Sequence, residues 1–492
     1  MLRNHSPMPR LLCVLGLALV VAAPVHAQQA ITFDEAIRLA LTQNTDLRQA
    51  EVADYASELN VSSAHADALP LPFISAYITP TQRYGLSFDQ TTGQLVSQTS
   101  EALNLGVNAS VNLFDGFRNR RALEQARLQR SASTFSLERT REQVAFEVAS
   151  RFLQLMLDEE IVGIRRESLE AQRAQLLQIE NLVDAGVRAR ADVFSQRAAV
   201  AGADGRLLQA EQAVELSETR LVEVLHLDPF ADYEFVAPAL DGDSLTLEEV
   251  SLDALLNAAY ERRADLQAQK RTIQAAETAI AVARSNRLPT IDLQAGFGTG
   301  YSSLQQRLVE PDAEPVFLPV TTENGDPVFL GGVPFEVPLQ LGPEQESTPI
   351  FAQFNDNRGG SIGLSISIPI FDRYQTSRQI QLAQIEVLRQ ELTMERLRLS
   401  VAVEVRQAII DYRNAAAQLR VTATQIEATE AALQAEQDRY ELGTGTLVAL
   451  AQARAQHTEA LSNRVQAVYQ FVFRRKLIDF ALGDLDLEGS LF

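Results

Sequence analysis

An internal duplication constrains the fold of this chain more than any other feature. Residues 32–77 align without a gap on residues 251–296, and LGVNASVNLFDGF at 105–117 matches IGLSISIPIFDRY at 362–374. The same register continues to Gly186 against Gly443. A repeat of this length indicates two similar structural units. We therefore expect a first structural repeat at residues 28–250 and a second at residues 251–492.

The second repeat contains an insertion. The offset between the two copies grows from 219 to 257, so 38 residues (257 − 219) are added between its two strands, at about residues 305–356. This segment holds eight of the 18 prolines, from Pro311 to Pro349, and no lysine or arginine lies between Arg307 and Arg358. Such a composition predicts an irregular, acidic and exposed loop.

Four segments have the alternating pattern of β-strands with one apolar face. Apolar residues take every second position in residues 105–113, 291–297 and 362–370, with Tyr301 extending the second run, and more weakly in 73–79; glycine, serine, asparagine and other small or polar residues lie mostly between them. An ordinary half-buried sheet would also produce this pattern. About ten residues of strict alternation are nevertheless typical of strands that cross a bilayer beside an aqueous lumen.

Each repeat continues into a very long predicted helix. Residues 117–184 contain no proline, and residues 374–441 contain neither proline nor glycine. At 1.5 Å per residue, about 67 residues would extend roughly 100 Å. Apolar residues recur every seven positions, which predicts a coiled-coil seam that needs neighbouring helices. These positions are Val148, Leu155, Val162, Leu169, Leu176 and Val183 in the first helix, and Val405, Tyr412, Leu419, Ile426, Leu433 and Tyr440 in the second.

The N-terminus predicts export across the inner membrane. Residues 1–27 combine Arg3 and Arg10 with a short apolar run and end in Val25-His26-Ala27, which is the pattern of a cleaved signal peptide. The single cysteine, Cys13, lies within this segment, so we expect no disulfide and no cysteine chemistry in the mature chain. The net charge of −21 makes nucleic acid an unsuitable partner.

The number of predicted strands has a consequence for assembly. Four strands cannot close a membrane barrel, because the smallest barrels have about eight and an open sheet edge is not tolerated in lipid. Two copies would give eight strands with a filled lumen, whereas three would give twelve and a lumen wide enough for water. Small residues on the inward face favour three copies, with the long helices projecting into the periplasm.

The sequence resembles the TolC family of outer-membrane export channels, the outer membrane factors, over essentially the whole mature chain. The motifs that carry the resemblance are the duplicated starts TFDEAI and SLDALL, the junctions LPLPF, LPTID, LFDGF and IFDRY, and the segments GVRARADV and GTGTLVAL. The resemblance implies a mostly helical fold with β-structure: a homotrimer whose twelve-stranded transmembrane barrel, surrounded by outer-membrane lipid, continues into a periplasmic helical barrel. It further implies an exit duct for efflux or type I secretion, joined to a periplasmic adaptor and an inner-membrane transporter.

The same resemblance assigns functions to the turns between the long and the returning helices. Gly186, Arg188 and Arg190 lie on the first turn, and Gly443 and Gly445 lie on the second. These turns form the periplasmic tip of the family fold, where the adaptor docks. We expect the two arginines to set the sign of the local electric field.

Family members commonly link their two hairpins near the closed tip through a tyrosine and an aspartate. Tyr440 and Asp192 occupy those positions, so the resemblance implies that they close the tip. The best-studied member has two aspartates at its entrance, where this chain has Ala449 and Gln452. An acidic entrance ring is therefore not expected here.

No pattern in the sequence indicates an enzyme. The three histidines outside the signal segment, His65, His226 and His457, lack a second ligand at metal spacing, so we expect no catalytic residues, no metal and no cofactor. Glycines at 296–300 resemble part of a dinucleotide loop, but no βαβ unit follows them. Two other readings remain open at this stage, a periplasmic adaptor with coiled-coil hairpins and a secreted coiled-coil structural protein.

Overall fold

A computed structural model describes residues 29–89, 93–236, 251–309, 316–339 and 344–484. The expected signal peptide at 1–27 lies outside these residues. The chain divides into two compact units, each built from segments of both repeats. The helical unit comprises Met1–Glu51, Leu137–Ala264 and Leu399–Phe492, and the strand-bearing unit comprises Val52–Ser136 and Asp265–Arg398.

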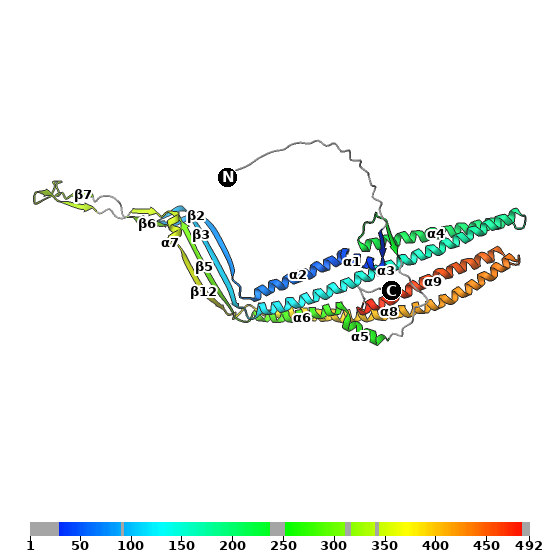
Figure 1. The fold of residues 1–492 in the computed structure, drawn as a ribbon. Helices are drawn as coiled ribbons and strands as arrows, with labels where there is room; N and C mark the ends of the chain where they lie inside the picture. Colours follow the sequence, from blue (N-terminus) through cyan, green and yellow to red (C-terminus); the bar gives the residue numbers. More distant parts are fainter. Residues whose placement is uncertain (1–28, 90–92, 237–250, 310–315, 340–343, 485–492) are drawn as a thin grey trace, which may run out of the picture. The chain divides into compact units, whose positions relative to one another are not determined.

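The order helix, strand, strand, long helix, turn and helix occurs in both halves of the chain (Figure 1). The helices are α1 (Phe33–Gln43), α2 (Thr45–Ala68), α3 (Arg118–Asp184), α4 (Arg190–Leu225), α5 (Leu252–Arg262), α6 (Ala264–Ser285), α7 (Ile350–Asp356), α8 (Gln375–Glu441) and α9 (Leu447–Leu482). The longer strands are β2 (Phe73–Asp89), β3 (Gln94–Phe114), β5 (Thr290–Ser302) and β12 (Gly359–Ser367). The short strands are β1 (Gln29–Thr32), β4 (Tyr233–Val236), β6 (Gln306–Val309), β7 (Val316–Pro319), β8 (Phe329–Leu330), β9 (Val333–Pro334), β10 (Glu336–Leu339) and β11 (Glu344–Ser347).

The two long helices, α3 and α8, each contain 67 residues, as their lack of proline predicts. Both begin beside an aspartate that follows a strand. The Asp115 carboxylate accepts a hydrogen bond from the Asn119 amide at 2.7 Å, and Asp372 accepts one from the Thr376 amide at 2.7 Å. These bonds satisfy amides that a helix leaves unpaired in its first turn. None of the helices in the described ranges combines the length and the apolar character needed to cross a membrane.

The predicted seven-residue seam is the packed face of both long helices. All of its twelve positions are buried or half-buried in the structure. In the helical unit, α3 and α4 form one antiparallel hairpin, and α8 and α9 form the other (Figure 1). Each long helix therefore has a returning partner that covers part of its seam, as a coiled coil requires.

The largest core of the helical unit joins residues that are far apart in sequence. Phe152 of α3 is fully buried, with its ring edge-on to Phe33 of α1 at 5.3 Å and to Phe235 of β4 at 6.1 Å. Strands β1 and β4 pair in parallel, with Ile31 opposite Phe235. Neither strand has an alternating pattern, so the sequence does not predict this two-stranded sheet.

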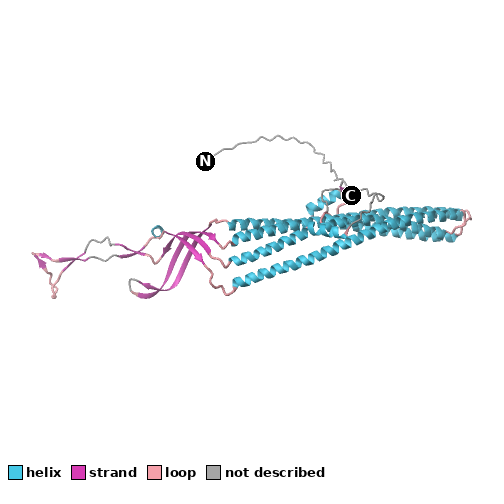
Figure 2. Ribbon diagram, turned by 90° about the horizontal axis from the view of Figure 1, so that it is seen from below, coloured by secondary structure: helices cyan, strands magenta, loops and turns pink. Residues whose placement is uncertain are grey.

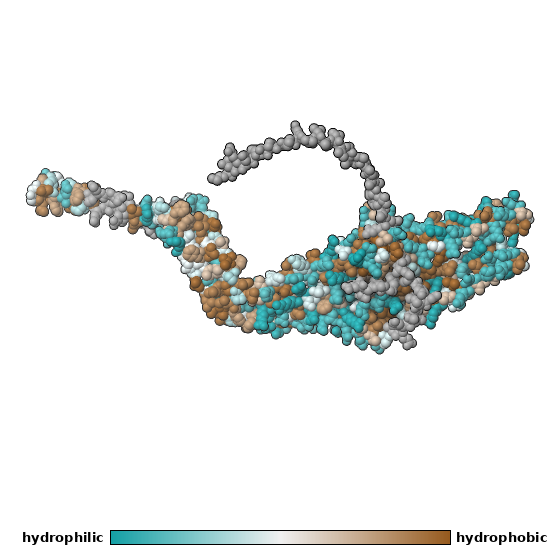
Figure 3. Space-filling view, viewed as in Figure 1, coloured by the Kyte–Doolittle hydropathy of each residue, from teal (hydrophilic) through white to brown (hydrophobic). Residues whose placement is uncertain are grey.

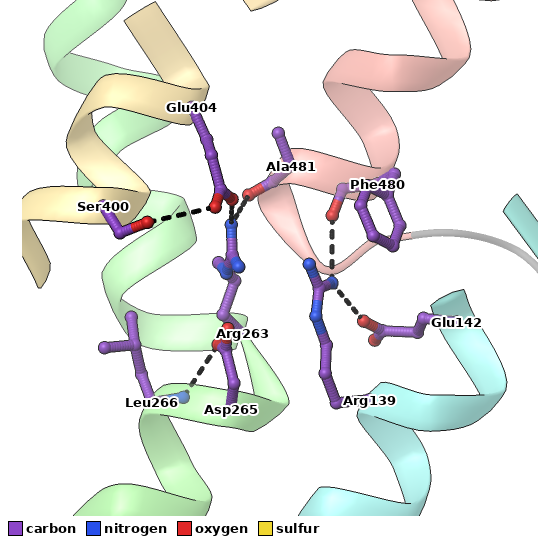
Figure 4. A network of polar contacts seen from close by, with 9 residues as sticks. All are labelled: Arg139, Glu142, Arg263, Asp265, Leu266, Ser400, Glu404, Phe480 and Ala481. Atoms are coloured by element: carbon purple, nitrogen blue, oxygen red, sulfur yellow. Dashed lines mark hydrogen bonds and ion pairs between the residues drawn. The ribbon is translucent and has the colours of Figure 1, made fainter. Parts of the chain in front are cut away.

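Two buried arginines hold the end of α9 (Figure 4). Arg139 of α3 donates a hydrogen bond to the Phe480 carbonyl at 3.3 Å, lies 4.1 Å from the centre of that ring, and pairs with Glu142 at 2.7 Å. Arg263, between α5 and α6, donates to the Ala481 carbonyl at 3.4 Å and pairs with Glu404 at 2.6 Å. Each guanidinium group thus donates to a carbonyl in the last turn of α9, and the Phe480 carbonyl also accepts a hydrogen bond from the Gly483 amide at 3.2 Å.

The first repeat has an equivalent contact with different chemistry. Asn44 corresponds to Arg263 at the offset of 219, and Val224 corresponds to Ala481 at the offset of 257. The Asn44 amide donates to the Val224 carbonyl at 3.5 Å, just as Arg263 donates to Ala481. The duplication therefore preserved a contact to a helix end while the side chain that makes it changed.

The strand-bearing unit contains a four-stranded antiparallel sheet, drawn in magenta in Figure 2. Its strands have the order β12-β5-β3-β2, as labelled in Figure 1. In the described residues, β12 and β2 are its two edges. β12 ends at Ser367, whereas the alternating pattern had predicted a strand continuing to Ile370. Pro369 explains the earlier end, because proline has no amide hydrogen to donate to the sheet.

The register places the alternating apolar residues at its paired positions on one face of this sheet. Ile78 lies opposite Leu105, Val107 opposite Phe297, and Leu364 opposite Leu293. Many of these side chains are exposed, such as Ile362 at 82%. Figure 3 shows the hydrophobic surface over these strands. The other face consists mainly of glycine, serine, threonine, asparagine and glutamine.

The insertion differs from the expected irregular loop. Three antiparallel strand pairs, β6·β11, β7·β10 and β8·β9, follow each other along it. Where the last two pairs meet, the amide of Val320 donates to Phe335, that of Phe335 to Val328, and that of Val328 to Val320, at 2.7–2.9 Å. The prolines restrict pairing to short stretches without preventing it. The described side chains of β7 to β10 are exposed, as the sequence predicted.

Candidate functional site at the hairpin turns

The two hairpin turns of the helical unit hold the residues that the sequence singles out. Gly186 and Gly443 have φ values of +79° and +73°, a backbone conformation that favours glycine. At Gly445 the constraint is steric, because a Cβ atom there would lie 2.9 Å from the Tyr440 amide nitrogen. Thr446 caps α9 by accepting a hydrogen bond from the Ala449 amide at 3.1 Å.

Tyr440 is the centre of a small core that joins the two hairpins. Its side chain is only 4% exposed and packs with Ile179 of α3, and with Leu447 and Leu450 of α9. Val193 of α4 packs against the same cluster. Residues from all four helices therefore meet beside the turns, so the hairpins of one chain are coupled by apolar contact.

Arg188 adds a polar link between the same hairpins. Its guanidinium carbon lies 4.5 Å from the centre of the Tyr440 ring, and its Nη2 donates to the Tyr440 carbonyl at 3.5 Å. A cation over an aromatic face is attracted by the electron density of the ring. The turn of the first hairpin thus holds the last turn of α8 in the second.

No hydrogen bond joins Asp192 to the Tyr440 hydroxyl among the described residues. Asp192 lies in the first turn of α4, where its own amide donates to the Ala189 carbonyl at 3.0 Å. The Tyr440 hydroxyl is buried and has no hydrogen-bond partner among the residues that the structure describes. A buried hydroxyl without a partner is costly, so Tyr440 retains an unused donor at the end of the hairpins.

The remaining candidates surround this cluster. Arg190 and Gln452 are exposed, and Ala449 is half-buried on α9. Arg454, which the sequence analysis did not select, lies close to Tyr440, and its pKa is lowered mainly by burial, an effect that the nearby Tyr440 opposes. One feature of the sequence could have indicated that Arg188 and Tyr440 form a pair. Both residues differ from their equivalents in the other repeat, since Gly445 corresponds to Arg188 and Val183 corresponds to Tyr440.

The chemistry of this site is that of contact and charge. In the described part of the chain, no group of three or more histidine, cysteine, aspartate and glutamate residues could hold a metal ion. The turns instead contain glycines with positive φ, the exposed Arg190, and Tyr440 with Arg188 packed on its ring. Such an arrangement can bind another protein surface and can resist separation of the two hairpins.

Comparison with protein families identifies this architecture. The model of the family described as "Outer membrane efflux protein" matches residues 36–225 and 255–484, a segment in each repeat. The chain belongs to the outer membrane efflux protein family. This membership confirms the resemblance to the TolC family.

Relatives of this outer membrane efflux protein agree with the assignment. Protein CyaE of Bordetella pertussis is 25% identical over 461 residues, which cover 92% of this chain and 84% of CyaE. The crystal structure of CusC, a protein that forms a transmembrane channel, matches with a TM-score of 0.71 at 16% identity, covering 92% of each chain. The CmeC outer membrane channel of Campylobacter jejuni matches with a TM-score of 0.71 at 14% identity, covering 93% of this chain and 87% of CmeC. The two structural matches support the fold.

Proposed function

We propose that this outer membrane efflux protein is the exit duct of a tripartite efflux or type I secretion system, and that three copies form one channel. The observation that carries the proposal is the four-stranded sheet, which has an exposed apolar face, a polar face and two edges unpaired in the described chain. An open edge is not tolerated in lipid, so further strands must come from other copies. Three copies supply twelve strands around a polar lumen.

The proposed partners follow from the two ends of such a channel. Outer-membrane lipid covers the apolar face of the barrel, and the helices extend into the periplasm. The turns around Gly186 and Gly443 dock with a periplasmic adaptor that is joined to an inner-membrane transporter. Small molecules or proteins then pass from the transporter to the exterior. The channel itself performs no catalysis and needs no cofactor.

The proposal also assigns the parts of the chain. Residues 1–27 act as a signal peptide that is removed during export. Residues 28–250 and 251–492 are the two structural repeats, each contributing two barrel strands and one hairpin. The acidic insertion at about 305–356 separates the two strands of the second repeat and faces the exterior.

The mass of the detergent-extracted protein tests the assembly. Light scattering, corrected for bound detergent, is expected to give three times the mass of the mature chain. A membrane fraction that releases the protein without detergent would contradict a channel and favour the secreted coiled-coil protein. A stable monomer or dimer in detergent would contradict the twelve-stranded barrel.

We further propose that Asp192 accepts a hydrogen bond from the Tyr440 hydroxyl of the same chain in the closed tip, which links the two hairpins. The buried hydroxyl of Tyr440 supports this, because it has no partner among the described residues and an acceptor would remove its desolvation cost. Asp192→Ala and Tyr440→Phe are therefore both expected to raise the closed-state conductance of the purified channel in planar bilayers. Combining the two is expected to add little, since both remove one bond.

The control for this pair is Asp184→Ala, because Asp184 ends α3 beside the same turn without a place in the proposed bond. Its closed-state conductance is expected to equal that of the unmodified protein. An unchanged conductance for Asp192→Ala, or fully additive effects in the double variant, would contradict the link.

A further inference from the structure

On the polar face of the sheet, one row of opposed residues contains a tyrosine on one strand and a glycine on each of the three remaining strands. Tyr77 of β2 is opposite Gly106 of β3, Gly106 is opposite Gly298 of β5, and Gly298 is opposite Gly359 of β12. Directly opposed residues point to the same face of a sheet. The row therefore places one large side chain and three positions without a side chain on the same face.

The Tyr77 ring uses the space that these glycines leave. A Cβ atom built on Gly106 would lie 2.7 Å from Cε1, Cζ and Oη of Tyr77, closer than real Cβ contacts allow. A Cβ atom on Gly298 would lie 3.6 Å from the same Oη. The ring thus lies flat across Gly106 and reaches toward Gly298, against the wall of the sheet.

The surface beside the ring remains open. A hollow of about 510 Å³ adjoins Tyr77, and Gly298, Gly300 and Gly359 are among the residues that line it. The rows on either side of Tyr77 carry smaller side chains at the corresponding β2 positions, Ser75 and Thr79. Among these three rows, Tyr77 has the largest side chain; Phe73 and Arg83, four and six positions away, are the other large residues on this face of β2.

We infer that Tyr77, seated on Gly106, sets the clearance of the channel lumen at the level of this row. This inference rests on the proposed trimer, in which the polar face lines the lumen. Three-fold symmetry places the three copies of Tyr77 at one height along the channel. A twelve-stranded barrel is only moderately wider than barrels that side chains fill, so three rings that stand away from the wall would narrow it strongly.

The glycine at position 106 is therefore a specificity-determining residue for the size of the exported substrate. With glycine, the ring stays flat and the passage is wide. With any larger residue, the ring must turn into the lumen, because the flat position is occupied. Tyr77 and Gly106 act as a pair, and changes at the two positions have opposite effects on the passage.

The clearance can be measured with a single cysteine placed on the helix-proximal side of Tyr77, because a reagent from outside must pass the ring to reach it. Ser367 lies at the helix-proximal end of β12 and on the same face as Tyr77, and Cys13 of the signal segment is the sole native cysteine. The full chain with Ser367→Cys is expressed in the outer membrane of intact cells. Maleimide-linked polyethylene glycols of increasing length are added outside, so they reach the thiol through the barrel.

The variants are expected to shift the size limit in opposite directions. Gly106→Ala should slow labelling by the longest reagents about tenfold, which corresponds to a barrier higher by about 1.4 kcal/mol. Small maleimides should react at an unchanged rate. Tyr77→Ala should accelerate the longest reagents, and the double variant Tyr77→Ala/Gly106→Ala should label like Tyr77→Ala.

Gly363→Ala is the matched control. It adds the same methyl group to the same face, where a Cβ atom would meet nothing within 4 Å, so labelling should not change. Equal rates in Gly106→Ala and Gly363→Ala would overturn the inference. So would an unchanged size limit in Tyr77→Ala, or a double variant as slow as Gly106→Ala.

A second reporter separates this inference from the proposed function. Leu364→Cys lies on the apolar face, three residues from Ser367. If small maleimides label both reporters at the same rate in the otherwise unmodified chain, the sheet does not enclose a lumen, and both proposals are overturned. If they label only Ser367→Cys but Gly106→Ala has no effect, the inference about Tyr77 fails and the channel stands.

Discussion

Arg188 connects the two hairpins of one chain by lying over the ring of Tyr440. A single substitution of Arg188 removes this contact. Removing a cation from an aromatic ring costs about 0.5–2 kcal/mol, depending on its exposure. In the proposed trimeric channel, Arg188→Ala is therefore expected to weaken the closed tip and to raise the closed-state conductance in planar bilayers. Arg188→Lys should have a smaller effect, because it keeps the positive charge.

Arg190 provides the comparison for Arg188, since it is exposed on the same turn. Arg190→Ala is expected to leave the closed-state conductance unchanged and to weaken binding of the adaptor instead. If the two alanine variants have the same conductance, the contact with Tyr440 does not hold the tip closed.

At the same scale, the sequence singles out Tyr440, Asp192 and Arg188 but does not predict the contact between Arg188 and Tyr440. Tyr440 and Asp192 were identified because they have the residue types and the spacing from the turn glycines that the family uses at these positions. The sequence could not show that the Arg188 side chain turns back over the Tyr440 ring, because side-chain direction depends on how the four helices pack. Arg454 was missed for the same reason, as its burial beside Tyr440 is a property of the folded cluster.

At the scale of elements, α4 contains a carboxyl group whose environment opposes its charge. Burial, followed by the nearby carboxylates of Asp232 and Glu215, raises the pKa of Glu218 above its ordinary value of 4.5. A raised pKa in the folded state means that folding favours the protonated form, so stability is lost as the pH rises through that pKa. Glu218→Gln is therefore expected to raise the melting temperature at neutral pH.

The gain should disappear below pH 4.5, where Glu218 is protonated in both the folded and the unfolded chain. Thermal unfolding at neutral and acidic pH, followed by circular dichroism, measures the difference. Glu223→Gln, an exposed position on the same helix, serves as the control with little change at either pH. A gain that persists in acid would show that the charge of Glu218 is not its cause.

Elements differed in how far the sequence predicted them. The ends of α3 and α8 agree with the sequence within one residue, because aspartate, glycine and the absence of proline are local signals. The pairing of β1 with β4 was missed, since it joins segments about 200 residues apart and neither shows alternation. In the insertion, the prolines concealed strands of two to four residues, which depend on pairing with each other.

At the scale of the whole molecule, the two faces of the sheet acquire different environments only through assembly. In a single chain, residues on both faces of β12 are exposed, including Ile362 at 82% and the neighbouring serines. A soluble protein rarely leaves such an apolar face uncovered. In the proposed trimer, lipid covers the apolar face and water contacts the other face. Introducing a charged side chain should therefore have different effects at neighbouring positions of one strand.

Leu364→Lys and Ser365→Lys test this difference on adjacent residues of β12. A lysine on a lipid-facing position near the middle of the bilayer costs about 2–4 kcal/mol per chain, whereas a lumen-facing position can hydrate the charge. Leu364→Lys is therefore expected to reduce strongly the yield of assembled trimer in the outer membrane, measured by gel electrophoresis without boiling. Ser365→Lys should assemble normally. In a secreted soluble protein, Leu364→Lys would replace an exposed apolar residue and improve recovery, so that result would contradict the barrel.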